Sequence, residues 1–311
     1  MHRENFDFAL TGAGFHCKII TESFPNDPIG VLFLKQKTEA VLLSANYHTH
    51  TPRCHHASGE EIDYIETARN AGMHTLGFSD HAPMLFDDGY ISDFRMLPEQ
   101  TEEYAVTLDK LKRQYAGEIE ILIGYEMEYY PRYFARSLAS ICRYPVDYLI
   151  LGQHFLENEY PVERPKNRSD GYSGATTDEE WKLGMYVDRV VSGMQTGAFS
   201  CVAHPDLMYF TGDDDIYRRH IVRLCECARD MRIPLEINLL GLGGGRAYPC
   251  DRFWRIAAEV GCSAVIGCDA HYPEMLTDPA VIERGFRYAE QFGIPLVHEL
   301  TLRDPRSALK Q

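Results

Sequence analysis

Short apolar runs alternate with amphipathic stretches along most of the chain. The runs cover residues 40–48, 74–80, 119–126, 146–154, 199–205, 234–241 and 263–269. They are nearly continuous in hydrophobic residues, which is typical of strands covered on both faces. Between them lie helical patterns such as residues 60–71, where Ile62, Ile65 and Ala68 share one face. The alternation of strands and helices predicts a parallel sheet.

This pattern favours an α/β fold in which seven strands form a closed or nearly closed barrel. We expect residues 40–311 to form one catalytic domain. Residues 1–39 fit the rhythm poorly and predict an N-terminal extension, in which residues 16–23 and 30–36 could pair as a β-hairpin. Residues 158–178 are polar and rich in Gly and Pro, which predicts a long loop that either covers a site or is simply solvated.

The composition is that of a globular protein with an acidic surface. Of its 311 residues, 45% are hydrophobic and 25% are charged, enough to bury a substantial core. The net charge of −15 disfavours binding to long nucleic acid or to an anionic membrane, which draws on clustered Lys and Arg. A phosphorylated ligand would need local positive charge, which bound metal ions could supply.

No segment predicts export or membrane insertion. The first residues lack a basic region followed by an apolar core, and no apolar run approaches the ~20 residues of a membrane span. The nine cysteines are scattered without CxxC spacing, so we interpret most of them as reduced core residues. We therefore expect a cytoplasmic protein, whose oligomeric state the sequence does not indicate.

Nearly every predicted strand ends in residues that can bind a metal ion or move a proton. Three ends carry two such residues separated by one position, so that both side chains point to the same side: His48 with His50, Glu126 with Glu128, and Asp269 with His271. Other ends carry Asp80 with His81, His154, and His204, and the loop after the first strand adds Cys54, His55 and His56. The carboxyl ends of the strands form the active-site face of α/β barrels, so these side chains should converge there.

Such a set of ligands predicts a metal-dependent phosphoesterase. Imidazole and carboxylate ligands favour Zn, Mn or Fe and exclude an all-oxygen calcium site, and thiolate sites are absent from the pattern. A single ion would be over-coordinated, which indicates two or three divalent transition-metal ions. Closely spaced ions suit phosphoryl transfer because they lower the pKa of a bridging water and stabilise both the attacking and the leaving oxygens.

Six motifs make the prediction more specific. In order along the chain they are HTHTPRCHHA, FSDHAP, GYEME, LGQHF, AHPDL and GCDAH, and together they resemble the motif series of the polymerase-and-histidinol-phosphatase (PHP) superfamily over roughly residues 44–300. The stretches CHHASGE and LEINLLGLGGGRAYP resemble its histidinol-phosphate phosphatase branch. The resemblance implies a distorted seven-stranded (β/α)7 barrel with a trinuclear metal centre at the C-terminal ends of the strands. It also implies hydrolysis of L-histidinol phosphate to L-histidinol and phosphate by a metal-bridging hydroxide.

The same resemblance implies a ligand set. His48, His50, Glu126 and Asp269 would hold one ion, Glu126 would bridge to a second ion held by His154 and His204, and His56, His81 and His271 would hold a third. All nine expected ligands are present, which argues against a non-catalytic copy of the domain. His55 is interpreted as a neighbour of the site.

The remaining polar residues have less specific roles. Besides Glu126, Asp80 and Asp206 are candidate catalytic residues. Asp80 could orient an imidazole or shuttle a proton, and the leaving group could be protonated by Asp80, by Asp206 or by a metal-bound water. Glu128 could support the site or form a salt bridge. Arginine suits the substrate phosphate because its fork binds two oxygens at once, and Arg53, Arg164, Arg168 and Arg246 follow strands, with Arg246 preferred for its glycine-rich loop.

Three rival functions stay open at this point. A relative acting on mononucleotides or other small nucleotides would use the same chemistry. An amidohydrolase-type barrel also begins with HxH and ends with Asp, but its bridging Lys has no strand-end counterpart here. A non-catalytic metal-binding domain would need none of the hydrolytic chemistry. If the protein is an enzyme, we expect its partner to be a small substrate. For the functions found in the PHP superfamily, that substrate would be phosphorylated.

Overall fold

A computed structural model describes residues 42–157, 159 and 171–310 of the chain. Seven strands lie within them: β1 (Ala45–Asn46), β2 (Thr75–Phe78), β3 (Glu120–Met127), β4 (Tyr148–Leu151), β5 (Cys201–Val202), β6 (Leu235–Asn238) and β7 (Ala264–Gly267). Each corresponds to one of the seven apolar runs. The predicted N-terminal extension and its hairpin lie outside the described residues, as do most of residues 158–170.

The strands form one parallel sheet in the order of the sequence, from β1 to β7. The sheet curves so that its two ends meet beyond β1 and β7, where Thr49 and Ala270 form a parallel bridge. The amide of His50 donates to the Ala270 carbonyl oxygen at 2.9 Å, and the Ala270 amide donates to the His48 carbonyl oxygen at 3.1 Å. The predicted seven-stranded α/β barrel is confirmed, and its closure joins two segments that carry predicted metal ligands.

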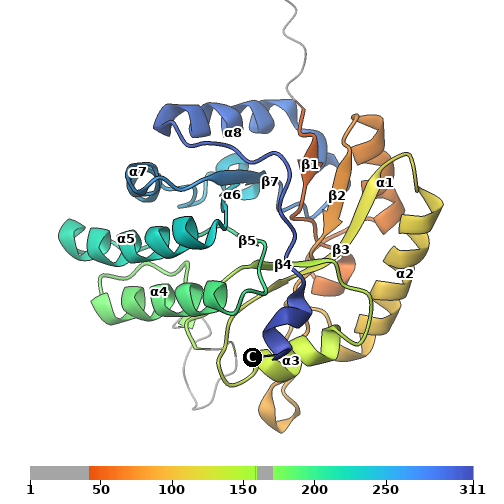
Figure 1. Cartoon of the computed structure of the whole chain (residues 1–311), viewed down its shortest axis with the longest axis horizontal. Helices are drawn as coiled ribbons and strands as arrows, with labels where there is room; N and C mark the ends of the chain where they lie inside the picture. Colours follow the sequence, from red (N-terminus) through yellow and green to blue (C-terminus); the bar gives the residue numbers. More distant parts are fainter. Residues whose placement is uncertain (1–41, 158, 160–170, 311) are drawn as a thin grey trace, which may run out of the picture. The chain divides into compact units, whose positions relative to one another are not determined.

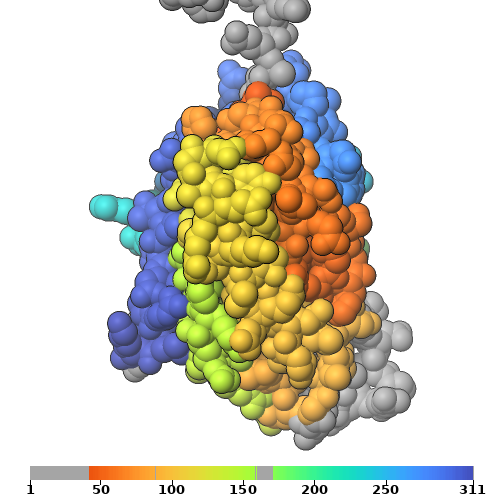
Figure 2. Space-filling view, turned by 90° about the vertical axis from the view of Figure 1, so that its right-hand side faces the viewer, coloured from red at the N-terminus to blue at the C-terminus, as the bar shows by residue number. Residues whose placement is uncertain are grey.

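Helices connect the parallel strands and cover the barrel (Figure 1). They are α1 (Glu61–Asn70), α2 (Thr101–Gln114), α3 (Phe134–Ile141), α4 (Glu180–Gln195), α5 (Asp214–Met231), α6 (Leu239–Gly244), α7 (Asp251–Val260) and α8 (Pro279–Phe292). Short 3-10 turns are η1 (Pro52–Cys54), η2 (Asp87–Gly89), η3 (Pro98–Gln100), η5 (Pro273–Thr277) and η6 (Pro305–Lys310). Helices α4, α5, α7 and α8 stack side by side, whereas α1 and α2 close the opposite side, where their side chains form a continuous surface (Figure 2).

The helices form where the sequence offers amphipathic faces and caps. On α5 the buried residues recur at helical spacing, and the Asp213 carboxylate caps its first turn by accepting hydrogen bonds from the amides of Asp215 and Ile216. On α1 the prediction was right about Ile65 and Ala68, which are buried. It was wrong about Ile62, which is exposed.

Alternation along the strands divides the core into two layers. Outward-facing side chains pack against the helices in a large apolar cluster. Inward-facing residues make a smaller cluster that fills the barrel, including Leu122, Tyr148, Ile150 and Val265. Residues two and four positions further along these strands point the same way. Towards the carboxyl ends these positions hold first a glycine, such as Gly124, and then a polar residue, such as Glu126. No helix among the described residues is long and apolar enough to cross a membrane.

Candidate metal centre

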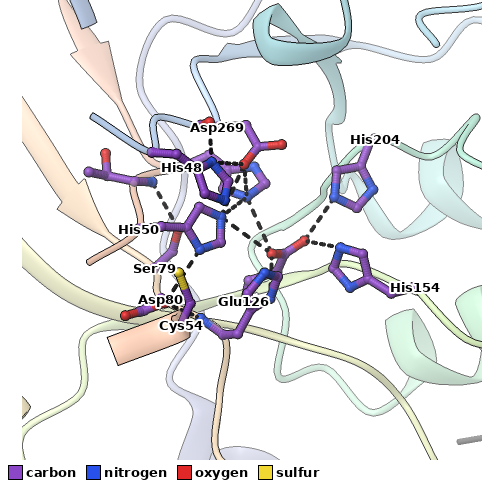
Figure 3. A network of polar contacts seen from close by, with 12 residues as sticks. His48, His50, Cys54, Ser79, Asp80, Glu126, His154, His204 and Asp269 are labelled. Atoms are coloured by element: carbon purple, nitrogen blue, oxygen red, sulfur yellow. Dashed lines mark hydrogen bonds and ion pairs between the residues drawn. The ribbon is translucent and has the colours of Figure 1, made fainter. Parts of the chain in front are cut away.

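The strand ends bring the predicted ligands together inside the mouth of the barrel. Figure 3 shows the carboxylate of Glu126 between His50 on one side and His154 and His204 on the other. Glu126 lies near the end of β3, and the histidines follow β1, β4 and β5. Side chains far apart in the sequence meet here because parallel strands place all their carboxyl ends at one end of a barrel.

Four donor atoms form a compact group of the kind that holds one ion. His48 Nε2 lies 3.1 Å from His50 Nε2 and 3.4 Å from both Glu126 Oε2 and Asp269 Oδ1. His50 Nε2 lies 3.6 Å from Glu126 Oε2 and 3.0 Å from Asp269 Oδ1. A tetrahedral ion with ligands at roughly 2.1 Å spaces its donors about 3.4 Å apart, which matches these separations.

The other carboxylate oxygen of Glu126 faces a second pair of histidines. Glu126 Oε1 lies 2.9 Å from His204 Nε2 and 3.4 Å from His154 Nε2. The two oxygens of one carboxylate are thus directed at two separate groups of imidazole nitrogens. This is the geometry that a carboxylate bridging two ions requires.

A third group of histidines lies on the side of His50. The ring centroid of His271 is 4.2 Å from that of His50 and 4.9 Å from that of His56, and the rings of His56 and His81 are 5.4 Å apart. The Nδ1 atoms of His56 and His271 are 2.6 Å and 3.0 Å from the backbone carbonyl oxygens of Cys54 and Asp269. Their Nε2 atoms are therefore left to bind an ion.

Cys54, in the loop after β1, places a thiol beside the third group of histidines. It is fully buried, its thiol contacts the imidazole of His50, and its sulfur lies within 4.8 Å of donor nitrogens of His56 and His271. Cys54 therefore lies beside the candidate cluster, as its place in the loop after the first strand indicates, and it is buried as expected of a core cysteine.

The donor set fits divalent cations by its chemistry. Glu126 is 1% exposed, and among the described residues neither of its carboxylate oxygens has a well-formed hydrogen bond, although His204 Nε2 lies 2.9 Å from Oε1. A buried, unsatisfied carboxylate is costly unless a cation compensates it. The backbones of His204 and Asp269 also have positive φ angles of 28° and 49°, a strained conformation that persists where a function requires it.

Electrostatics keeps the carboxylates ionised. Burial raises the pKa of Glu126, but the surrounding histidines, His154 foremost, outweigh it and hold that pKa well below its usual value. The pKa of Asp269 is lowered in the same way against burial, chiefly by His48. Burial, assisted by the charge of His50, lowers the pKa of His271 to about 4, so this imidazole is neutral and able to bind a metal ion at neutral pH.

Two residues of β6 support the cluster and were not predicted. Glu236 Oε1 lies 2.8 Å from His48 Nδ1, which leaves Nε2 of His48 facing the other donors. Asn238 donates hydrogen bonds to Glu236 Oε2 at 2.9 Å and to Asp269 Oδ2 at 3.1 Å. Their alternation within the run PLEINLLG is the signal that could have revealed them, because it matches the spacing of the predicted ligands.

Glu128 and Asp80 hold histidines in place. Glu128 Oε1 lies 2.9 Å from His154 Nδ1. Asp80 Oδ1 lies 3.4 Å from His50 Nδ1, while its other oxygen accepts a hydrogen bond from the Thr51 hydroxyl. Asp80 does not line the cavity beside the cluster. Of the two roles considered for Asp80, the orientation of an imidazole is the one that its contacts favour.

Asp206 does not line that cavity either. Its Oδ2 accepts hydrogen bonds from the Cys250 amide at 2.6 Å and from the Trp254 indole at 3.0 Å. Burial raises the pKa of Asp206 to about 7, against the opposing effect of the Cys250 amide. The carboxyl therefore anchors the segment after His204 to α7, and its position does not favour direct proton donation to a substrate.

A cavity of about 560 Å³ adjoins the cluster, a volume typical of small-molecule sites. Seven of the nine predicted ligands line it: His56, His81, Glu126, His154, His204, Asp269 and His271. Phe94, Phe155, Tyr172 and Tyr248 form much of the remaining wall, and no lysine of the described residues lines it. Tyr172 belongs to the described end of the predicted long loop and pairs with Phe155 in a short antiparallel bridge.

Of the four arginines of the sequence prediction, two lie among the described residues. Arg246 lines the cavity and donates a hydrogen bond to the Tyr248 hydroxyl at 2.9 Å. Arg53 does not line it, because its guanidinium is paired with Glu61 and Glu103. Its assignment to substrate binding is therefore not carried forward. Arg168, like Arg164, lies outside the described residues.

Fold and site together define a class, an α/β barrel with a candidate divalent-metal centre at the carboxyl ends of its parallel strands. The sequence profile of the PHP domain matches residues 46–239. The chain belongs to the PHP domain family, and the resemblance inferred from its motifs is confirmed.

Several similar proteins are named as histidinol phosphatases. A protein of Deinococcus radiodurans named "probable histidinol-phosphatase" is 29% identical over 253 residues, which cover 78% of this chain and 89% of that protein. One of Schizosaccharomyces pombe with the same name is 25% identical and covers 74% of this chain and 81% of its own length. The histidinol phosphate phosphatase of Lactococcus lactis, solved with zinc, L-histidinol and phosphate, matches with a TM-score of 0.62 at 17% identity, over 84% of this chain and 99% of that one. This last likeness shows the shared fold.

Proposed function

We propose that this chain is a metal-dependent phosphomonoesterase that hydrolyses L-histidinol phosphate to L-histidinol and phosphate. The observation that carries the proposal is the buried carboxylate of Glu126, which has no well-formed hydrogen bond among the described residues and is directed at two groups of imidazoles beside a substrate-sized cavity. Membership of the PHP domain family and the names of the relatives support the choice of substrate. A cytoplasmic location stays a prediction from the sequence.

The proposed centre holds two or three divalent ions, with Zn, Mn and Fe as candidates. His48, His50, Glu126 and Asp269 would hold the first ion, Glu126, His154 and His204 the second, and His56, His81 and His271 the third. When bound, the ions supply an activated water nucleophile and neutralise charge on the phosphoryl oxygens.

The chain's own residues position the substrate beside these ligands. Within the described residues the guanidinium of Arg246 makes one hydrogen bond, to Tyr248, and its fork of N–H donors suits the oxygens of a phosphate in the cavity. The aromatic wall of Phe155, Tyr172 and Tyr248 offers an apolar surface to the flat ring of the substrate. Asp80 and Glu236 hold His50 and His48 by their Nδ1 atoms, so that the Nε2 atoms point into the cluster.

Phosphate release from L-histidinol phosphate tests the proposal directly. Protein reconstituted separately with Mn, Zn and Fe should hydrolyse this substrate faster than a panel of nucleoside monophosphates and a dinucleotide, and a chelator should abolish the reaction. Preference for a nucleotide would keep the chemistry and replace the substrate, whereas no phosphate release from any ester with any metal would refute the function.

A pair of variants in β3 connects the activity to the site. Glu126→Ala should release at least one ion and abolish turnover, because it removes the carboxylate directed at both groups of histidines. Glu120→Ala, at the exposed start of the same strand, should retain the metal content and activity of the wild type. Full activity with full metal content in Glu126→Ala would contradict the assignment.

A further inference from the structure

Arg95 is a fully buried arginine that lies outside the candidate cluster. It belongs to the segment between η2 and η3, in neither a helix nor a strand, and is 1% exposed. Burying a guanidinium costs free energy unless charged partners bind it, because water no longer solvates the charge. The partners of Arg95 therefore indicate why it is buried. No motif in the sequence had singled it out.

Every N–H donor of this guanidinium has an acceptor. Nη1 and Nη2 donate to the two carboxylate oxygens of Glu128 at 2.9 Å and 3.0 Å. Nε and Nη2 donate to the two carboxylate oxygens of Glu159 at 2.7 Å and 3.1 Å, and Nη1 also donates to the carbonyl oxygen of Ala82 at 3.0 Å. Four of these five hydrogen bonds form two bidentate forks, a geometry available to arginine and not to lysine.

The next contact leads from Arg95 to the metal centre. Glu128 Oε1, which accepts from Arg95, also lies 2.9 Å from His154 Nδ1. With the proton on Nδ1, the lone pair of His154 is on Nε2, which faces Glu126 Oε1 at 3.4 Å. The ring of Phe94, which lies under the Arg95 guanidinium at 4.4 Å, also contacts the ring of His154 edge-on at 5.9 Å.

The charges of Arg95 and its two carboxylate partners do not cancel. Glu128 and Glu159 carry two buried negative charges against the single positive charge of Arg95. The residual negative charge lies beside His154, where it makes the imidazole a stronger donor to a cation. Arg95 therefore compensates enough charge to let Glu128 be buried, and fixes the orientation in which Glu128 meets the histidine.

We infer that Arg95 is a positioning residue for the second ion: through Glu128 it fixes the tautomer and direction of His154. The inference rests on the proposed metal centre, and its effect is expected at one ion only. Within the described part of the chain, no hydrogen bond or ion pair joins the side chain of Arg95 or Glu128 to the imidazoles that would hold the other ions. Phe94 also meets the ring of His81, edge-on at 5.1 Å, without a polar contact between them.

Metal affinity, measured apart from catalysis, tests this role. Apo-protein is titrated with Zn in competition with a chromogenic chelator, so that each ion gives its own dissociation constant. Arg95→Lys keeps the charge but loses both forks, and should weaken one ion by about 10- to 100-fold while the others keep their affinity. Excess metal should then restore most of kcat with KM unchanged. Arg306→Lys removes the hydrogen bonds of a partly buried arginine to the carbonyls of Tyr144 and Val146, and should leave all the dissociation constants unchanged.

Two results would overturn the inference. Either all ions bind Arg95→Lys with wild-type affinity although its melting temperature falls, or all ions are weakened equally. If Arg95→Lys does not fold, Glu159→Gln carries the same test, because it loosens one fork without touching Glu128, and should weaken the same ion by less. The titration requires no substrate. If the wild type lacks phosphatase activity, the proposed function is refuted, but the metal affinities still test the role of Arg95.

Discussion

The position of the Glu126 carboxylate depends both on the histidines that surround it and on the space beside it. Histidines that follow β1, β2, β4 and β5 approach it, with nitrogen–oxygen distances between 2.9 Å and 3.4 Å for His48, His81, His154 and His204. Space for the carboxylate exists because the adjacent inward position on the β4 segment is Gly152. A Cβ atom there would lie 1.8 Å from Glu126 Oε1.

Gly152→Ala should therefore damage the centre without removing any ligand. The added methyl group must displace the Glu126 carboxylate, and a misplacement near 1 Å at a reacting centre costs about 100-fold in rate. We expect loss of at least one ion and a fall in kcat of about 100-fold or more, measured by metal analysis and phosphate release.

The matched control is Gly184→Ala in α4. A Cβ atom there would lie 3.2 Å from the side chain of His220, which can shift, and alanine is the better helix former. This variant should keep its metal content and activity. Wild-type metal content and rate in Gly152→Ala would show that the carboxylate does not need its present position.

At the scale of elements, the strands and the direction of their ends could be predicted from sequence, because apolar runs and residue alternation are local signals. His48, Glu126 and Asp269 were found in this way, each at the end of a run. Arg95 could not be, since it lies in an irregular segment and its partners Glu128 and Glu159 are 33 and 64 residues away. Contacts of that kind become visible only when the barrel closes.

For other side chains the sequence indicates the position along the chain but not the partner in the fold. Arg53 follows a strand as a phosphate-binding arginine would, yet Glu61 and Glu103 from α1 and α2 neutralise it. Asp206 follows His204 closely, but α7 supplies the indole of Trp254 that binds its carboxyl. In both cases a neighbouring helix decides the role, and its position depends on packing that no local pattern encodes.

The segment after α6 gives a prediction at this scale. Helix α6 ends at Gly244, and Gly245, with a φ of 62°, reverses the chain so that Arg246 lines the cavity. Arg246→Ala should raise KM for L-histidinol phosphate at least about tenfold with metal content unchanged, since it removes a phosphate-binding fork and none of the proposed metal ligands.

Steady-state kinetics of Arg246→Ala and of the exposed Arg287→Ala on α8 check this prediction. Arg287 pairs with Glu283 on its own helix and should be neutral. A smaller increase in KM is expected for Tyr248→Phe, because the hydroxyl that accepts a hydrogen bond from Arg246 is lost. An unchanged KM in Arg246→Ala would remove this residue from substrate binding.

At the scale of the whole molecule, the cluster connects the first and the last strand of the barrel. His48 and His50 precede or follow the closing bridge from the β1 side, and Asp269 and His271 flank it from the β7 side. An ion held by His48, His50 and Asp269 would therefore cross-link the first and last strands of a protein whose net charge is −15. Metal binding should stabilise the fold by closing it.

This stabilisation should depend on pH in a defined direction. Burial lowers the pKa of His48, but the carboxylates of Glu236, Asp269 and Glu126 outweigh it and raise the pKa well above its usual value. The pKa of His50 is likewise raised against burial, chiefly by Asp269 and Asp80. In the metal-free protein both imidazoles therefore hold protons at neutral pH, and an ion must displace them.

The melting temperature of metal-free and metal-loaded protein, compared between pH 6 and pH 8, measures this linkage. In the metal-free protein the stability contributed by raised histidine pKa values is complete below about pH 6.5 and is lost as pH rises through the folded-state pKa. In the loaded protein, proton competition weakens over the same range, so the gain on metal binding should grow with pH. At 100 times the dissociation constant one site adds about 2.7 kcal/mol, or roughly 5 °C for a domain of this size. A gain that is larger at pH 6 than at pH 8 would show that His48 and His50 do not exchange protons for the ion.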